Sequence, residues 1–274
     1  MRSLVLGLAT LVAAASASAA DMPIFDAHLH YSHDAWGYLS PKDAVALLKK
    51  AGIKRALVSS SDDEGTQKLM REAPDLILPE LRPYRRRGEQ STWFKDESVV
   101  GFLEDRLRRS RYVAIGEFHL YGADADLPVP RRMVELARQH ELFLHAHSDV
   151  DAIERLFRQD PNARILWAHS GFERPEVVRA MLRKYPNLVC DLAFRSEHGS
   201  GGKVPEEWRA AFLEFPDRFM VGTDTFTPER WPYVTEHAVW SRAWLNDLPR
   251  DVAERIGHRN GDKIFGPMLD RRTQ

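Results

Sequence analysis

Short apolar runs alternate with amphipathic segments along almost the whole chain, and this alternation most restricts the fold. The apolar runs predict β-strands at residues 23–25, 53–60, 76–79, 112–117, 142–145, 164–169, 187–192 and 218–224. The segments between them predict helices at residues 41–51, 63–72, 94–109, 130–140, 150–157, 175–184, 205–215 and 232–245. Such a repeat predicts parallel strands joined by crossover helices. Eight strand–helix units in about 250 residues favour an α/β fold of the (β/α)8 barrel type over an open doubly wound sheet.

Local signals mark helix boundaries in two places. Ser40 and Pro41 have the pattern of an N-cap residue followed by the first helical position, and Gly52 is a typical helix end. Asp149 is a second expected N-cap, ahead of an apolar stripe that begins at Val150. No linker or change in composition divides the chain, so we expect the eight units to form one domain.

Residues 1–20 have the pattern of a cleaved secretory signal peptide. Arg2 is a short positive region, residues 4–15 are apolar, and small residues at 17–20 offer a cleavage site. The apolar run is shorter than the roughly 20 residues that a membrane-spanning helix needs. We therefore expect a barrel domain over residues 21–274, export to the periplasm, and no membrane span in the mature chain.

Charge and cysteine content narrow the class of protein. The 39 basic and 40 acidic residues give a formal net charge of −1, which gives no support for nucleic-acid binding. Cys190 is the only cysteine, so no intramolecular disulfide forms, and its apolar surroundings predict a buried strand residue. The expected partner is a small-molecule substrate, and the oligomeric state is left open.

Ionisable residues gather where the predicted strands end. These ends carry His28 and His30, Glu117, His145 and His147, His169, and Asp224. Most of the eleven histidines lie at or just past such an end: His28, His30, His33, His119, His145, His147, His169 and His198. A histidine pair is a weak motif alone, but structural histidines have no reason to choose strand ends repeatedly. Because barrel enzymes build their active sites at this face, the pattern predicts a functional site.

Imidazoles and carboxylates in this arrangement favour Zn²⁺, with Mn²⁺, Co²⁺ or Fe²⁺ as alternatives. The expected metal ligands are His28, His30, Glu117, His145, His169 and Asp224. The two histidines of the first strand and the aspartate of the eighth would hold one ion. His145 and His169 would hold a second ion, and Glu117 would bridge the two ions. His147 shares a face with His145, but a cation rarely needs both, so His145 is the preferred ligand.

Further residues have expected roles in catalysis and substrate binding. Asp224 is the expected general base for a metal-activated water, and His169 is expected to polarise or protonate the substrate, with His198 as an alternative. Arg82 and Arg195 are candidates to bind a substrate carboxylate or phosphate, since guanidinium matches either group bidentately. Candidates for apolar walls are Tyr84, Trp93, Tyr121 and Phe226.

In the order of these motifs the chain resembles the amidohydrolase superfamily, and within it the amidohydrolase 2 branch. The matching pieces are DAHLH at 26–30, IGE at 115–117, LHA at 144–146, AHSG at 168–171, VGTD at 221–224 and the tail at 256–266. The resemblance implies a (β/α)8 barrel with one or two metal ions, and hydrolysis of an ester, lactone, amide or phosphoester bond. Many binuclear members carry a carboxylated lysine on strand four, whereas Glu117 resembles the branches that bridge with glutamate.

Two other functions agree with the same pattern. Some members of this branch are metal-dependent decarboxylases of small aromatic acids, and the strand pattern does not separate them from hydrolases. A non-catalytic exported binding protein on the same barrel is the other alternative. The full set of ligands at the strand ends argues against a binder, because a binder does not need a base beside a metal.

Overall fold

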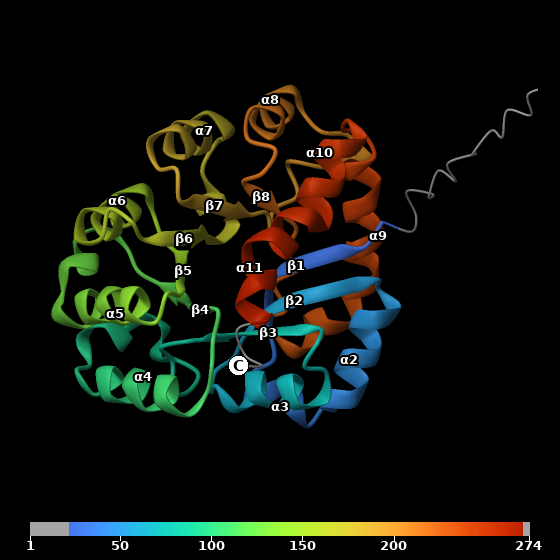
Figure 1. Cartoon of the computed structure of the whole chain (residues 1–274). Coiled ribbons are helices and arrows are strands. Elements are labelled where there is room, and N and C mark those ends of the chain that lie inside the picture. The colour runs from blue at the N-terminus through green and yellow to red at the C-terminus, as the bar shows by residue number, and fades with distance from the viewer. Residues whose placement is uncertain (1–21, 271–274) are drawn as a thin grey trace, which may run out of the picture.

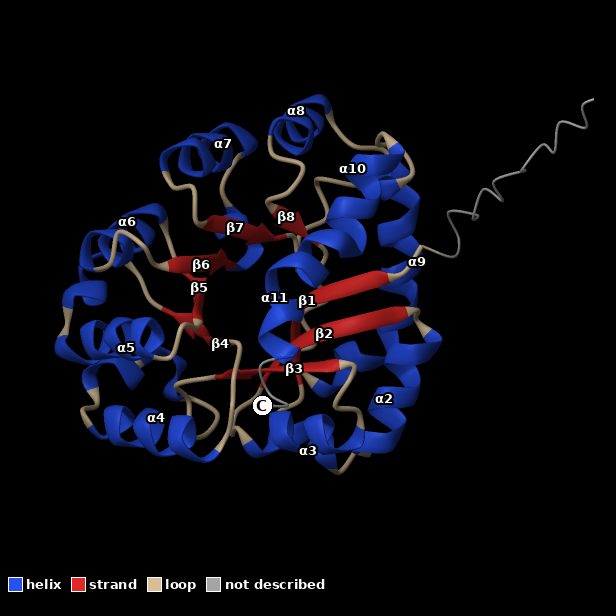
Figure 2. Cartoon of the chain, viewed as in Figure 1, coloured by secondary structure: helices blue, strands red, loops and turns tan. Residues whose placement is uncertain are grey.

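The computed structural model describes residues 22–270, so the predicted signal peptide lies outside the described residues. Eight parallel strands follow one another in chain order and form a nearly closed barrel, with helices between them (Figure 2). The strands are β1 (Ile24–His30), β2 (Ile53–Ser59), β3 (Ile77–Leu81), β4 (Ala114–His119), β5 (Phe143–His147), β6 (Arg164–Trp167), β7 (Leu188–Asp191) and β8 (Phe219–Met220). This arrangement confirms the predicted alternation and is consistent with a (β/α)8 barrel.

The helices form a layer outside the strands (Figure 1). They are α1 (His33–Trp36), α2 (Pro41–Lys50), α3 (Glu64–Glu72), α4 (Ser98–Arg109), α5 (Pro128–Gln139), α6 (Val150–Gln159), α7 (Pro175–Lys184), α8 (Glu206–Glu214), α9 (Val234–Leu245), α10 (Arg250–Glu254) and α11 (Asn260–Asp270). The Ser40 and Asp149 side chains accept hydrogen bonds from backbone N–H groups at the starts of α2 and α6, which confirms both N-caps. Between residues 22 and 270, no helix has the length and apolar character to cross a membrane.

The largest departures from the predicted elements lie where strands leave the barrel. The strand predicted at 164–169 ends at Trp167, and the strand predicted at 218–224 ends at Met220. His169 and Asp224, in the segments that follow these two strands, both have left-handed backbone conformations. The helix predicted at 94–109 begins at Ser98, because a 3₁₀ turn precedes it.

Backbone contacts join the first strand to the segment that follows the last strand. The Ala27 N–H donates to the Val221 carbonyl, and the Asp224 N–H donates to the His28 carbonyl, both at 2.8 Å. These bonds bring the ends of β1 and β8 together, although regular sheet pairing does not continue between them. They also place Asp224 directly beside the histidines of β1.

The carboxyl-terminal helix closes the floor of the barrel. In Figure 1, α11 lies across the end of the barrel that faces the viewer. Its Phe265 ring packs against Phe25 of β1, with centroids 6.0 Å apart, and against Phe143 of β5, with centroids 4.7 Å apart. The Asn260 side-chain amide donates to the Phe219 carbonyl and fastens the start of the helix to β8. The buried apolar floor consists of Phe25, Ala27, Leu57, Leu78, Val113, Ala114, Phe143, Leu166, Val189, Met220 and Phe265.

An aromatic cluster packs between α8 and α9 and encloses one histidine. The His198 ring lies 4.8 Å from the ring of Trp244, 5.2 Å from that of Trp240 and 6.1 Å from that of Trp208. Both ring nitrogens are buried, and no described residue forms a hydrogen bond with them. Burial lowers the pKa of His198 to about 3, because the charged form has no compensating partner there.

This histidine predicts a loss of stability in acid. The unfolded chain binds a proton at His198 below pH about 6.5 and the folded chain does not, so the free energy of unfolding falls as the pH drops. We compare the free energy of unfolding of His198→Leu with that of wild type by urea unfolding of chelator-treated protein. The difference between the two proteins should shift in favour of His198→Leu by about 2 kcal/mol when the pH falls from 7.5 to 5. His140→Leu, at an exposed histidine, controls for the loss of an imidazole. The prediction would be contradicted if the free energies of unfolding of His198→Leu and wild type differed by the same amount at pH 7.5 and pH 5.

Candidate metal and active site

The interior of the barrel changes character with height along each strand. On β5, Phe143 belongs to the apolar floor, His145 is fully buried above it, and His147 lines an open cavity. Alternate residues of a strand face the same side, so these three positions step upward inside the barrel. On β3 the same ladder runs through Leu78, Glu80 and Arg82. The barrel therefore has an apolar floor, a buried ionic layer and an open cavity.

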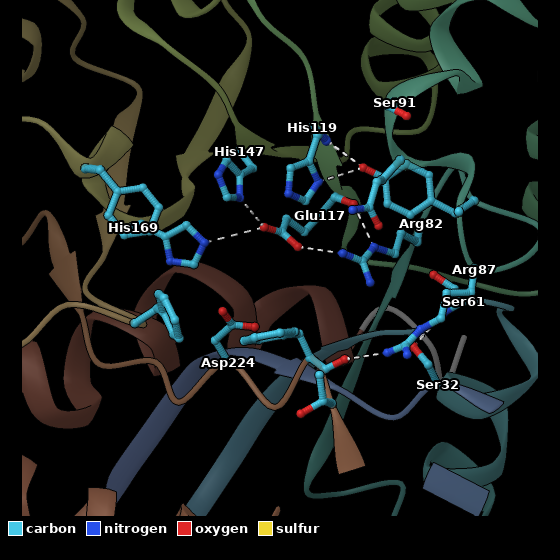
Figure 3. Close-up of a pocket in the computed structure, with 17 residues that line it drawn as sticks. Ser32, Ser61, Arg82, Arg87, Ser91, Glu117, His119, His147, His169 and Asp224 are labelled. Carbon is cyan, nitrogen blue, oxygen red and sulfur yellow. Dashed lines mark hydrogen bonds and ion pairs between the residues drawn. The ribbon is translucent and has the colours of Figure 1, made fainter. Parts of the chain in front are cut away.

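The cavity lies at the carboxyl ends of the strands and has a volume of about 750 Å³. Figure 3 shows Glu117 near its centre, with histidines from several strand ends directed toward it. The lining residues are Ser32, Ser61, Arg82, Tyr84, Arg87, Gly88, Gln90, Ser91, Glu117, His119, His147, His169, Phe172, Phe194, Asp224, Phe226 and Thr227. Four of the predicted site residues, Arg82, Glu117, His169 and Asp224, therefore meet in one cavity.

The two carboxylate oxygens of Glu117 face different partners. Oε1 lies 2.8 Å from His147 Nδ1 and 3.5 Å from His169 Nε2. Oε2 lies 3.2 Å from His30 Nε2 and 2.7 Å from the Arg82 guanidinium, which also donates to the Glu117 carbonyl. Glu117 therefore connects the histidines of β1 with His147 at the end of β5 and His169 after β6.

The first-strand histidines direct their Nε2 atoms toward each other. His28 Nδ1 lies 3.2 Å from an Asp191 carboxylate oxygen, and His30 Nδ1 lies 2.9 Å from the Ser59 carbonyl. Because both partners are acceptors, each neutral ring carries its hydrogen on Nδ1 and a lone pair on Nε2. The two Nε2 atoms are 3.1 Å apart. Two acceptors at this distance repel each other unless a proton or a cation lies between or beside them.

His169 follows the same rule on the other side of the glutamate. Its Nδ1 lies 2.9 Å from the Ala193 carbonyl, so its Nε2 lone pair is directed toward Glu117. Metal-binding histidines usually donate their second ring nitrogen to a carbonyl or carboxylate in this way. Three histidines of the site thus have the tautomer that metal binding requires.

Asp224 adds an unsatisfied carboxylate oxygen to this group. Its Oδ1 is buried and accepts no hydrogen bond from the described residues, although it lies 3.3 Å from His30 Nε2 and 3.8 Å from His28 Nε2. Burial opposes ionisation of Asp224, but the neighbouring His28 and His30 outweigh it and lower its pKa to about 2. The backbone of Asp224 is left-handed, a strained state that often occurs at functional sites.

Opposite charges sustain each other in this buried cluster. Burial disfavours the charged form of His28, but Glu117, Asp191 and Asp224 outweigh burial and hold its pKa well above the usual value. Burial likewise disfavours the Glu117 carboxylate, yet His28 and hydrogen bonds from His147 and His169 hold the pKa of that carboxyl well below its usual range. The cluster therefore contains anions that need positive charge close by.

The donor atoms fit a divalent cation. Groups of donor atoms within 4.8 Å of one another are His28, His30 and Glu117; His28, His169 and Asp224; His28, His145 and Asp191; and Glu117, His119 and His147. Neutral imidazoles and carboxylates are the ligands that Zn²⁺ prefers. The orphaned Asp224 oxygen and the facing Nε2 lone pairs are the atoms that such an ion would satisfy.

Below the cavity, a buried chain of hydrogen bonds runs under the histidines. His145 Nδ1 lies 3.0 Å from Glu80, and its Nε2 lies 3.1 Å from the Asp191 oxygen that also faces His28. Burial opposes the charge on His145, but Glu80 and Asp191 outweigh it and raise its pKa to about 9. Burial also opposes the charge on Asp191, and His28 and His145 lower its pKa below the usual value.

The structure separates the two histidines of β5. His145 lies in the buried layer, with both ring nitrogens facing carboxylates, whereas His147 lies in the cavity beside Glu117. The sequence analysis preferred His145 as the ligand that shares the bridging glutamate. In the structure His147 occupies that place, because it is one step higher on the inward-facing ladder of the strand.

Two predicted substrate-binding residues do not line the cavity. The guanidinium of Arg195 donates to the carbonyls of His169 and Glu173 and forms an ion pair with Glu197. It braces the loop that carries His169. His198 lies in the aromatic cluster between α8 and α9.

Asp191 and Glu80 were missing from the expected set. Both are fully or almost fully buried acids near the carboxyl ends of their strands, where the other site residues lie. The positional rule applied to His28 and Asp224 would have found them. Asp191 lies inside the strand predicted at 187–192, and Glu80 directly follows the one predicted at 76–79.

The amidohydrolase family profile matches residues 25–266, and no curated protein matches the chain. An uncharacterised TIM-barrel protein from Bordetella bronchiseptica is 14% identical with a TM-score of 0.62, covering 91% of this chain and 100% of its own. An amidohydrolase from Burkholderia multivorans with bound HEPES is 12% identical with a TM-score of 0.54, covering 89% and 99%. The β-aspartyl dipeptidase of Fervidobacterium islandicum is 13% identical with a TM-score of 0.53, covering 89% and 72%.

At these identities the solved structures show a shared fold, whereas the family profile spans nearly all of the described chain. The resemblance expected from the motifs is therefore confirmed, and this chain belongs to the amidohydrolase family of hydrolytic enzymes, which normally bind a divalent metal.

Proposed function

We propose that this amidohydrolase cleaves an ester, lactone, amide or phosphoester bond of a small molecule with the help of one or two divalent cations, Zn²⁺ above others. The observation that supports this most is the set of three Nε2 lone pairs on His28, His30 and His169. Hydrogen bonds at their Nδ1 atoms direct all three toward Glu117 and Asp224.

The proposed ligands fall into two sets around the glutamate. On the Oε2 side lie His28, His30 and Asp224, and on the Oε1 side lie His147 and His169. We assign the ligand role on β5 to His147, because His145 is already engaged by two carboxylates. A bound cation supplies Lewis acidity, which makes water a nucleophile near neutral pH and polarises the bond to be cleaved.

Asp224 is the proposed general base. Its carboxylate lines the cavity, and the Oδ1 atom accepts no hydrogen bond from the described residues, so it is placed to take a proton from water in the cavity. It takes the proton from the attacking water as the new bond to carbon or phosphorus forms, and it returns that proton to the departing oxygen or nitrogen. The Arg82 guanidinium holds Glu117 in place, because it donates hydrogen bonds to the carboxylate and to the backbone carbonyl of Glu117.

Metal removal tests the requirement for a cation. Dialysis against a chelator should abolish turnover of the active members of a panel of esters, lactones, amides and phosphoesters, and added Zn²⁺ or Mn²⁺ should restore it. Elemental analysis then counts the ions per chain. Turnover that persists in metal-free protein would contradict the proposal. Release of CO₂ from carboxylated aromatic substrates, without hydrolysis of any panel member, would instead support the decarboxylase alternative.

Replacement of the base should separate proton transfer from metal binding. Asp224→Asn keeps an oxygen donor but removes the proton acceptor, so kcat should fall by at least about 100-fold while bound metal is retained. Asp43→Asn makes the same change at an exposed position on α2 and should leave kcat unaltered. Full activity of Asp224→Asn in metal-replete protein would show that another group accepts the proton.

The buried Asp191 should tune metal affinity through the His28 ring. Asp191→Asn removes the carboxylate that fixes the His28 tautomer, so Zn²⁺ affinity should fall by about 10- to 100-fold in competition with a chromophoric chelator. Circular dichroism checks that the variant is folded, and Asp43→Asn is again the matched control. Unchanged Zn²⁺ affinity in folded Asp191→Asn would mean that the first-strand pairing alone orients His28.

A further inference from the structure

Three exposed phenylalanines line one side of the cavity. Phe172, Phe194 and Phe226 have 49%, 51% and 43% of their surface exposed. All thirteen phenylalanines of the chain lie in its described part, and these three are the only exposed ones among them. Exposed apolar surface that gathers in a cavity commonly marks a ligand-binding site. We call these three residues the aromatic wall.

The fold holds the aromatic wall in place at a cost in backbone conformation. Phe172 and Phe194 both have φ of 55°, a left-handed conformation that is rare for bulky side chains. Each lies three positions after a polar residue of the site, Phe172 after His169 and Phe194 after Asp191. The loops therefore turn these rings toward the cavity directly after the strands deliver the polar groups.

The aromatic wall adjoins the proposed metal ligands. The Phe172 ring stacks on the His169 ring, with centroids 4.6 Å apart and planes 20° apart. The Phe194 and Phe226 rings meet edge to face with centroids 5.6 Å apart. The Arg230 guanidinium lies 4.7 Å from the Phe194 ring centroid and donates to the Asp224 carbonyl, so it ties the wall to the loop of the proposed base. A group that contacts the wall is thus next to the bond that the site would cleave.

The positively charged side chains in the lining of the cavity are already paired with carboxylates. Arg82 lies 2.7 Å from Glu117, and Arg87 lies 2.6 Å from Asp34 and also donates to the Phe226 carbonyl. These are the two arginines that line the cavity in the described part of the chain. A substrate carboxylate or phosphate at either guanidinium would compete with a protein carboxylate for the same positive charge.

We infer that the aromatic wall is a subsite for an uncharged aryl or alkyl group attached close to the scissile bond. The preferred substrates are then neutral, apolar esters, lactones or amides, and not the carboxylated or phosphorylated compounds for which Arg82 and Arg195 first suggested a role. This inference rests on the proposed hydrolytic function, because the wall is defined by its position beside His169 and Asp224. The wall contributes apolar contact, and the polar residues of the cavity lining contribute hydrogen bonds to a neutral group.

A pair of fluorescent probes tests the subsite without catalysis. N-phenyl-1-naphthylamine is neutral, and its 8-sulfonate has the same rings with a negative charge. The neutral probe should bind saturably and at least about tenfold more tightly than the sulfonate. Phe194→Ala should weaken binding of the neutral probe by about tenfold or more, because it removes a ring from the contact. Phe194→Leu should keep most of the affinity, and Tyr38→Ala, at an exposed aromatic outside the cavity, should keep all of it.

Equal binding of both probes, or neutral-probe binding unaffected by Phe194→Ala, would overturn the inference.

Steady-state kinetics provide a second test, with metal-loaded enzyme and paired neutral substrates that carry either a phenyl or a methyl group. Phe194→Ala should raise KM for the phenyl substrate by about tenfold and leave kcat and the methyl substrate nearly unchanged. Phe194-dependent probe binding without any turnover would refute the proposed hydrolysis while supporting the apolar subsite. If both substrates are hydrolysed and Phe194→Ala changes neither rate, the result would support the proposed hydrolysis and refute the apolar subsite.

Discussion

The contact on which the site depends is the one between the facing Nε2 atoms of His28 and His30, 3.1 Å apart. In water, two such lone pairs would turn away from each other. Here the Asp191 carboxylate and the Ser59 carbonyl hold the Nδ1 hydrogens, so the rings cannot rotate without losing a buried hydrogen bond. The surrounding carboxylates add negative charge to the same small volume. The folded barrel therefore needs positive charge at this place, and a single divalent cation can supply it.

Much of the fold was predictable because strand–helix alternation depends on local patterns. The apolar runs located all eight strands, and the N-caps at Ser40 and Asp149 formed as expected. Strand ends were less predictable where the backbone becomes left-handed, as at His169 and Asp224. Those conformations follow from hydrogen bonds to distant segments, such as the one between Asp224 and His28, and no local propensity encodes them.

The candidate site was predictable in outline and not in depth. The rule that functional residues lie at strand ends predicted that Glu117, His169 and Asp224 share a site, and all three line one cavity. It could not rank His145 against His147, since both lie near the end of the same strand and share a face. Their difference is height above the apolar floor, and height depends on the register of β5 against its neighbours. Register is a property of the assembled sheet, so a single strand does not reveal it.

The closure of the floor by α11 links the far end of the barrel to the candidate site. Phe265 and Asn260 belong to the last described helix, yet they complete the packing of β1 and β8. The floor that these contacts complete lies directly below the buried ionic layer, where a low dielectric makes charged pairs strong. A change that loosens α11 would therefore act on the candidate site from the opposite end of the barrel.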